Sequence, residues 1–81
     1  MLSPVGEELR RLLALLVDRP EELRVEEFRS GTTVDFEVRV EGQDLGKVIG
    51  RGGRTIDSLR ALLAARGALQ GERYELEVAE D

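Results

Sequence analysis

Apolar residues recur at helical spacing at the start of the chain. Between residues 4 and 17 this spacing gives a helix with one apolar face, formed by Val5, Leu9, Leu12, Leu13 and Leu16. Ser3 and Pro4 are typical of a helix N-cap and of the first helical position. We therefore predict a helix from about Pro4 to Val17. We interpret its apolar face as core packing rather than as a surface for a membrane or a partner.

Two strand patterns follow this helix. The segment Leu23–Ser30 is apolar at positions 23, 25 and 28, and its period slips at Glu26 and Glu27, which suggests a bulge or a sheet edge. Between Val34 and Val40 every second residue is apolar and the residues between them are charged. Such strict alternation predicts a hairpin strand with one buried face.

Two helices and a last strand are predicted in the second half of the chain. Asp44 is a favourable N-cap for a short helix, Leu45–Ile49, which Gly50 closes. A longer helix is expected from about residue 54 to residue 65, followed by a loop that Gly67 and Gly71 bracket. Apolar residues at positions 74, 76 and 78 then alternate as a strand.

The order of these elements is helix, strand, strand, helix, helix, strand. It predicts an α+β fold in which one sheet packs against a layer of helices. The 81 residues have room for one such domain, which we expect to span residues 1–81.

Composition narrows the class of function. The chain has no cysteine and no histidine, so it lacks thiolate metal ligands and the commonest general base. Asp44 and Asp57 are the nearest approach to a metal pair, and we interpret them as an N-cap and a solvated side chain. We therefore expect no enzyme activity, no cofactor and no metal.

Hydropathy bears on where the protein works. No apolar run approaches the roughly 18 residues that span a bilayer. Charged side chains interrupt the first 17 residues, where a signal peptide would be apolar. We expect a cytoplasmic protein with no membrane contact.

Charge is distributed unevenly along the chain. The net charge is −5, which by itself argues against nucleic-acid binding. The segment from Gly46 to Arg66, however, holds five basic residues and one acidic residue, so it carries +4 and the remainder carries −9. The sequence therefore predicts a small basic face on an acidic body, and binding depends on such local charge.

This basic face contains a glycine-rich loop. The eleven residues from Gly46 to Ile56 include four glycines and three basic side chains. Glycine allows positive φ and leaves backbone amides uncovered, and the following helix would direct its first N–H groups at the same place. These features suit the binding of a nucleic-acid phosphate backbone. The alternative is that the glycines serve only to turn the chain. The spacing matches neither a Walker A loop nor a dinucleotide-binding fingerprint.

The segment Val48–Ile56 resembles the signature of the KH domain, Val-Ile-Gly-x-x-Gly-x-x-Ile. Because a helix and a strand precede it, the order of elements resembles the bacterial, type II form of that fold. The resemblance covers essentially the whole chain. Within the KH domains, the chain is most similar to the small stand-alone bacterial KH proteins of the KhpA family. It implies a type II KH domain, with a three-stranded mixed sheet packed against three helices, and RNA binding in the cytoplasm.

The resemblance also implies which residues contact RNA. Gly50 and Gly53 match the fixed glycines of the loop, while Arg51 and Gly52 occupy its variable positions. In the family the loop holds the sugar-phosphate backbone, and about four unpaired bases lie in an apolar groove between the two helices and a strand. The implied RNA-binding residues are Lys47, Val48, Ile49, Gly50, Arg51, Gly52, Gly53, Arg54, Ile56 and Leu59.

Two departures bear on affinity and specificity. Gly52 stands where relatives often carry a basic or amide side chain, so we expect a modest affinity. No aromatic residue lies in the loop or in the two helices beside it, so we expect a weak sequence preference.

Two functions follow as hypotheses. In the first, the protein clamps short single-stranded RNA as a post-transcriptional regulator or RNA chaperone, without catalysis. In the second, the KH fold serves mainly as an adaptor. The resemblance implies as its partner a second KH protein of the KhpB (Jag) type, a second copy of the chain in a dimer, or the ribosome.

Overall fold

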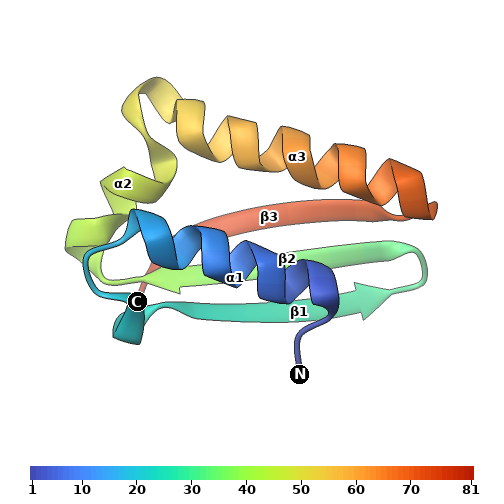
Figure 1. Cartoon of the computed structure of the whole chain (residues 1–81), viewed down its shortest axis with the longest axis horizontal. Helices are drawn as coiled ribbons and strands as arrows, with labels where there is room; N and C mark the ends of the chain where they lie inside the picture. Colours follow the sequence, from blue (N-terminus) through green and yellow to red (C-terminus); the bar gives the residue numbers. More distant parts are fainter.

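Three helices cover one face of a three-stranded sheet in a computed structural model that describes residues 1–81 (Figure 1). The element order is the one that the sequence predicts. Short 3-10 turns occupy Pro20–Glu22, Gly42–Asp44 and Arg51–Gly53. The helices and strands are α1 (Pro4–Leu16), β1 (Arg24–Ser30), β2 (Thr33–Val40), α2 (Leu45–Ile49), α3 (Arg54–Gln70) and β3 (Arg73–Glu80).

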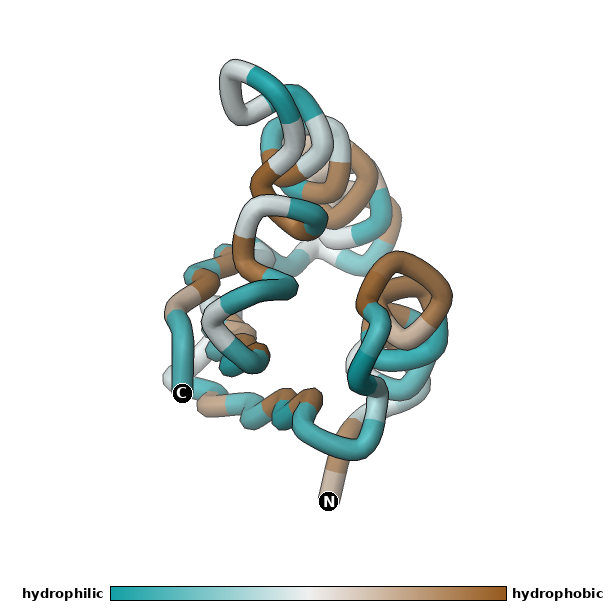
Figure 2. Tube along the Cα trace, turned by 90° about the vertical axis from the view of Figure 1, so that its left-hand side faces the viewer, coloured by the Kyte–Doolittle hydropathy of each residue, from teal (hydrophilic) through white to brown (hydrophobic).

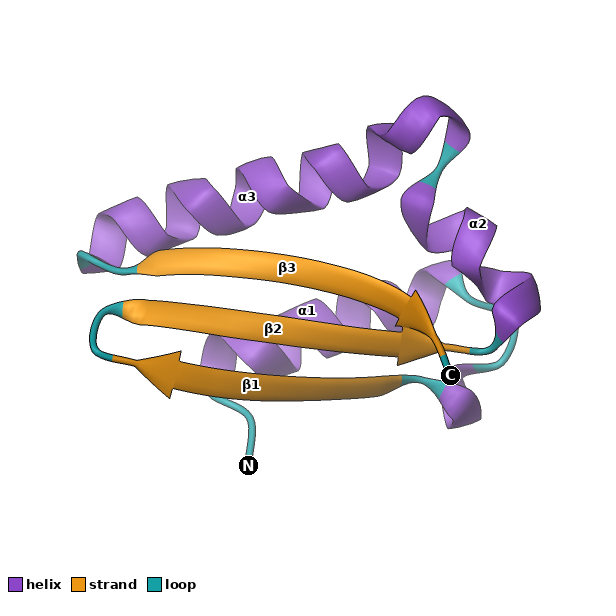
Figure 3. Cartoon of the chain, turned by 180° about the vertical axis from the view of Figure 1, so that it is seen from behind, coloured by secondary structure: helices purple, strands orange, loops and turns teal.

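The sheet is mixed, with β2 in the centre. β1 pairs with β2 in antiparallel orientation, and β3 pairs with β2 in parallel orientation (Figure 3). The parallel pair is possible because α2 and α3 carry the chain back across the sheet before β3 begins. This confirms the α+β fold and the type II KH arrangement.

The core lies between the sheet and the helices. Alternation along β2 buries Val34, Phe36, Val38 and Val40 to 1% exposure or less, as the sequence predicts. The Phe36 and Tyr74 rings meet edge to face, with centroids 5.6 Å apart and an interplanar angle of 87°. Figure 2 looks along the layers and shows hydrophobic segments of α1 and α3 on the same side of the sheet.

The predicted bulge in the first strand is wrong, and its alternative, a sheet edge, is correct. β1 and β2 pair without interruption, with Glu26 opposite Glu37 and Glu27 opposite Phe36. Glu27 therefore faces the helices, where its Oε1 accepts hydrogen bonds from the N–H and the hydroxyl of Ser3 at 3.0 and 2.8 Å. Phe28 lies on the open face of the sheet and is 49% exposed.

The prediction of a loop between Gly67 and Gly71 is also wrong, because α3 continues to Gln70. Gly67 is buried within the helix, and a Cβ added there would lie 2.5 Å from the carbonyl oxygen of Glu72. The glycine thus permits close approach of the chain and does not end the helix. Gly71, at φ 68°, is the residue that ends it.

Asp44 precedes α2 as predicted, but its side chain does not cap that helix. The carboxylate is 2% exposed and accepts hydrogen bonds from the N–H groups of Asp18 at 3.2 Å and Arg19 at 3.0 Å. Burial acts to raise the pKa of Asp44, but these two hydrogen bonds, together with the charges of Lys47 and Arg19, hold the pKa below its usual range. Asp44 therefore ties the turn after α1 to the start of α2.

The apolar face of α1 is only partly used in the core. Val5, Leu9 and Leu13 are buried, whereas Leu12 is 48% exposed and Leu16 is 38% exposed. The expectation of core packing is therefore wrong for these last two residues. No helix of the chain combines the length and the apolar character needed to cross a membrane.

Candidate nucleic-acid interface

Three glycines at positive φ shape the turn between α2 and α3. Gly50 lies at φ 79°, ψ 168°, Gly52 at φ 64°, ψ 19°, and Gly53 at φ 78°, ψ 13°. The last two values are left-handed helical, which other residues adopt at a cost, whereas the first is essentially restricted to glycine. These glycines let the chain turn within four residues, from the end of α2 at Ile49 to the start of α3 at Arg54.

Space around the glycines also differs. A Cβ at Gly50 would collide with the Thr55 side chain and lie 2.8 Å from the Thr55 backbone nitrogen. A Cβ at Gly52 would meet nothing within 4 Å. Gly50 is therefore required by both conformation and packing, while Gly52 sits at an open position of the loop.

The loop leads directly into the N-terminus of α3. Gly53 is the N-cap residue, and no side chain caps the helix. The first backbone N–H groups of a helix have no partner within it, and the helix dipole adds partial positive charge there. This end of α3 can therefore attract an anion, although Asp57 in its first turn opposes that effect.

Two of the three predicted basic residues carry unpaired charge. Arg51 and Arg54 are exposed and form no ion pair. Lys47 contacts the Asp18 carboxylate and lies 3.7 Å from Oδ1 of Asp44. The hydrogen bond with Asp18 is the main cause that raises the pKa of Lys47. The lysine charge is thus compensated by the turn after α1.

The apolar residues of the signature lie mostly in the core. Val48, Ile56 and Leu59 are 0%, 8% and 8% exposed, and Ile49 is partly buried against them. The first three therefore pack in the core and hold the loop and its two flanking helices in position. Only Ile49 keeps enough exposure to touch a bound molecule.

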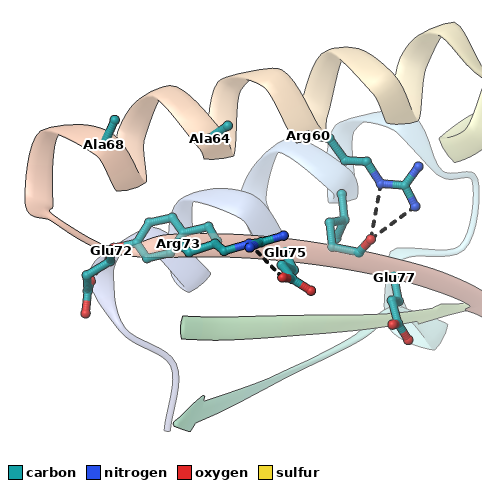
Figure 4. Close-up of a pocket in the computed structure, with 9 residues that line it drawn as sticks. Arg60, Ala64, Ala68, Glu72, Arg73, Glu75 and Glu77 are labelled. Carbon is teal, nitrogen blue, oxygen red and sulfur yellow. Dashed lines mark hydrogen bonds and ion pairs between the residues drawn. The ribbon is translucent and has the colours of Figure 1, made fainter. Parts of the chain in front are cut away.

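A groove of about 560 Å³ runs between α3 and the free edge of β3 (Figure 4). We call it the α3–β3 groove. Arg60 spans it, because its Nε and Nη2 donate hydrogen bonds to the Leu76 carbonyl oxygen at 3.3 and 3.2 Å. Its lining residues are Arg60, Ala64, Ala68, Glu72, Arg73, Tyr74, Glu75, Leu76 and Glu77.

Arg60 belongs to the basic segment of the sequence, but the KH signature does not include it among the implied RNA-binding residues. Spacing offered a signal, since residues 60, 64 and 68 recur at intervals of four and share one helix face. That this face borders β3 depends on the sheet order, which no local pattern shows.

A second groove, of about 310 Å³, lies between α1 and α3. We call it the leucine groove. Leu12, Leu62 and Leu69 line it and are 48%, 63% and 85% exposed. An ion pair between Arg66 and Glu8, at 2.8 Å, joins the two helices beside these leucines. Apolar side chains left open in this way favour contact with another macromolecule.

Two helices joined by a Gly-x-x-Gly loop, inserted between the parallel strands of a mixed sheet, define a KH domain of type II. Residues 7–78 match the family model described as KhpA/KhpB, KH domain. The chain therefore belongs to this family.

Similar proteins from several bacteria carry the same name, "RNA-binding protein KhpA". The one from Chlamydia pneumoniae is 40% identical over 75 residues, which cover 93% of this chain and 96% of the relative. The one from Aquifex aeolicus is 45% identical over 65 residues, covering 80% and 82%. The one from Mycobacterium tuberculosis is 43% identical over 67 residues, covering 83% and 84%.

Proposed function

We propose that the protein binds short single-stranded RNA without catalysing a reaction, and that the loop Gly50–Gly53 holds the sugar-phosphate backbone. The observation that carries this proposal is that two exposed arginines without ion-pair partners, Arg51 and Arg54, lie beside the uncapped N-terminus of α3. The family and the names of the relatives support RNA as the ligand.

The charges of the α3–β3 groove and of the loop favour one placement of the RNA. Phosphates bind at the loop, where backbone amides and two arginines converge. The α3–β3 groove carries three glutamates against two arginines, so it repels a phosphate and accepts an uncharged base. Lys47 is the weakest of the basic contacts, because Asp18 and Asp44 already hold it. A grip on so few nucleotides suits an RNA chaperone or a post-transcriptional regulator.

The double substitution Arg51→Asp, Gly52→Asp should weaken RNA binding at least about 30-fold, because it places two negative charges where phosphate lies. For wild type, log affinity should fall with log salt at a slope of roughly −1.5, as expected for about two neutralised phosphates of a single strand. Fluorescence anisotropy with a labelled, unstructured RNA oligonucleotide measures both quantities.

A matched control is available on the other side of the molecule. Arg39→Asp with Gly31→Asp makes the same change of charge and also replaces an exposed glycine at positive φ, 61°, with open space around it. This control should bind RNA within about threefold of wild type, since its charges lie on the sheet and its hairpin. Equal loss in both variants, or retained binding in the loop variant, would refute the proposed contact.

The leucine groove favours a second function, that of an adaptor. We propose that it binds a second KH domain, either another copy of this chain or a KhpB-type protein. Burying its exposed leucines would release roughly 1.5–3 kcal/mol for each side chain fully covered. This contact lies on the side of α3 away from β3, so it leaves the α3–β3 groove free.

Leu62→Glu with Leu69→Glu should therefore convert a dimer into a monomer, because carboxylates would have to be buried in the contact. Analytical ultracentrifugation across a concentration series measures the change. Leu15→Glu is the control, since Leu15 is 83% exposed on α1 but lies outside the leucine groove. A wild type that stays monomeric and does not bind a KhpB-type protein would rule out this function.

A further inference from the structure

One arginine beyond the loop is held in a fixed position. The Nε and Nη2 of Arg60 both donate to the carbonyl oxygen of Leu76. β3 is an edge strand and pairs only with β2, so this carbonyl points away from the sheet toward α3. The bond orients the guanidinium across the α3–β3 groove, as Figure 4 shows.

Half of the guanidinium remains available for a ligand. A guanidinium has five N–H donors in one plane, and the Leu76 carbonyl occupies only the edge formed by Nε and Nη2. Nη1 makes no hydrogen bond and lies 3.7 Å from Oδ1 of Asp57, which is an exposed contact. The edge formed by Nη1 and Nη2 therefore presents parallel donors, and the side chain is 49% exposed.

Arg60 stands at the right distance from the loop to meet a base. It lies six residues after Arg54 on the same helix, which corresponds to about 9 Å along the axis. Beyond it, Ala64 and Ala68 follow at successive turns and leave room above β3 (Figure 4). An RNA strand with one phosphate bound at the loop would thus bring a neighbouring base to the guanidinium of Arg60.

We propose that Arg60 reads a guanine base in the α3–β3 groove and so gives RNA binding by this protein a sequence preference. This inference rests on the proposed function, because it requires the RNA backbone on the loop. It differs from the weak preference that the lack of aromatic residues suggests, since a fixed guanidinium can select a base by hydrogen bonding alone.

Guanine is the base that fits the groups present. Its O6 and N7 are adjacent acceptors that take two parallel N–H donors from an arginine. Its amino group is a donor, and the glutamates that line the groove supply acceptors. Adenine offers an acceptor next to a donor, so one of the two arginine N–H groups would face an N–H. Uracil and cytosine are pyrimidines and lack the O6/N7 edge altogether.

The test compares heptamers of uridine in which the central base is G, A, C or U. Wild type should bind the G heptamer at least about fivefold more tightly than the others, the discrimination typical of one bidentate contact. Arg60→Lys keeps the charge but lacks the planar fork. It should reduce the preference to less than about twofold by weakening the G heptamer far more than the all-U heptamer, while the salt slope stays that of wild type because the charge is kept. Arg39→Lys, on the open face of the sheet, is the control and should keep the preference.

A second measurement does not depend on a variant. The Nε–H resonance of Arg60 in ¹⁵N-labelled wild type should shift on addition of the G heptamer and not of the A heptamer. A preference that persists in Arg60→Lys, or equal binding of all four heptamers, would overturn the role of Arg60. If wild type bound all four heptamers equally and the Arg51→Asp, Gly52→Asp variant bound none of them, the proposed RNA contact at the loop would be supported and the role of Arg60 would not. No binding of any heptamer by wild type would overturn both.

Discussion

Replacing Asp44 by alanine should lower the melting temperature by at least about 10 °C, a large effect for a domain of this size. The carboxylate is 2% exposed and accepts hydrogen bonds from the N–H groups of Asp18 and Arg19. Alanine would leave both donors without a partner in a closed turn, and an unsatisfied buried donor is costly. Thermal unfolding followed by circular dichroism at pH 7 measures the effect.

Asp57→Ala provides the comparison, because Asp57 is an aspartate whose side chain is 73% exposed. Its melting temperature should stay within a few degrees of wild type, as for most surface substitutions. If Asp44→Ala melted no earlier than Asp57→Ala, the bonds to the turn after α1 would not hold the fold together.

The same residue makes stability depend on pH. Burial alone would raise the pKa of Asp44, but the two backbone hydrogen bonds and the charges of Lys47 and Arg19 together lower it below its ordinary value. A lowered pKa in the folded state means that the carboxylate contributes stability in full above about pH 4, and that this contribution is lost as the pH falls below it. Asp44→Asn should therefore lose less stability than wild type between pH 6 and pH 3. Glu8 and Glu72, whose pKa values are also lowered, keep the same acid dependence in both proteins.

The parts of the fold that could be predicted are those with one dominant local signal. The alternation along β2 has a single cause, burial of one face, and it predicts that strand correctly. Gly50 was expected to close α2, and it does so at a positive φ that other residues avoid. The Gly-x-x-Gly signature then placed the loop between the correct pair of helices.

The errors arose where a long-range contact opposed a local rule. Glu27 interrupts the apolar period of β1 because Ser3, 24 residues away, needs an acceptor. Gly67 resembles a helix stop, but close packing against Glu72 is what requires it. Lys47 is likewise paired with Asp18, 29 residues away, which no local pattern indicates, and its contact with RNA stays a prediction. None of these partners is adjacent in the sequence.

Replacing Gly50 by alanine should both destabilise the protein and abolish RNA binding. The backbone at φ 79°, ψ 168° lies in a region that is essentially glycine-only and costs another residue about 1–3 kcal/mol. The added Cβ would also overlap Thr55 at the start of α3, and overpacking of this kind costs about 1–3 kcal/mol more. We expect a total of about 2–6 kcal/mol in the free energy of unfolding, measured by urea denaturation, and no detectable binding in anisotropy.

Gly52→Ala, two residues away, separates this effect from a general intolerance of the loop. Its left-handed conformation costs alanine about 1–2 kcal/mol, but no atom lies within 4 Å of the added Cβ. It should bind RNA within about threefold of wild type, because the amides and both arginines keep their places. The different outcomes would show that Gly50 fixes the path of the chain, while Gly52 only permits it. If Gly50→Ala bound RNA as tightly as Gly52→Ala at a temperature where both are folded, the loop conformation seen here would not be the one that holds the phosphates.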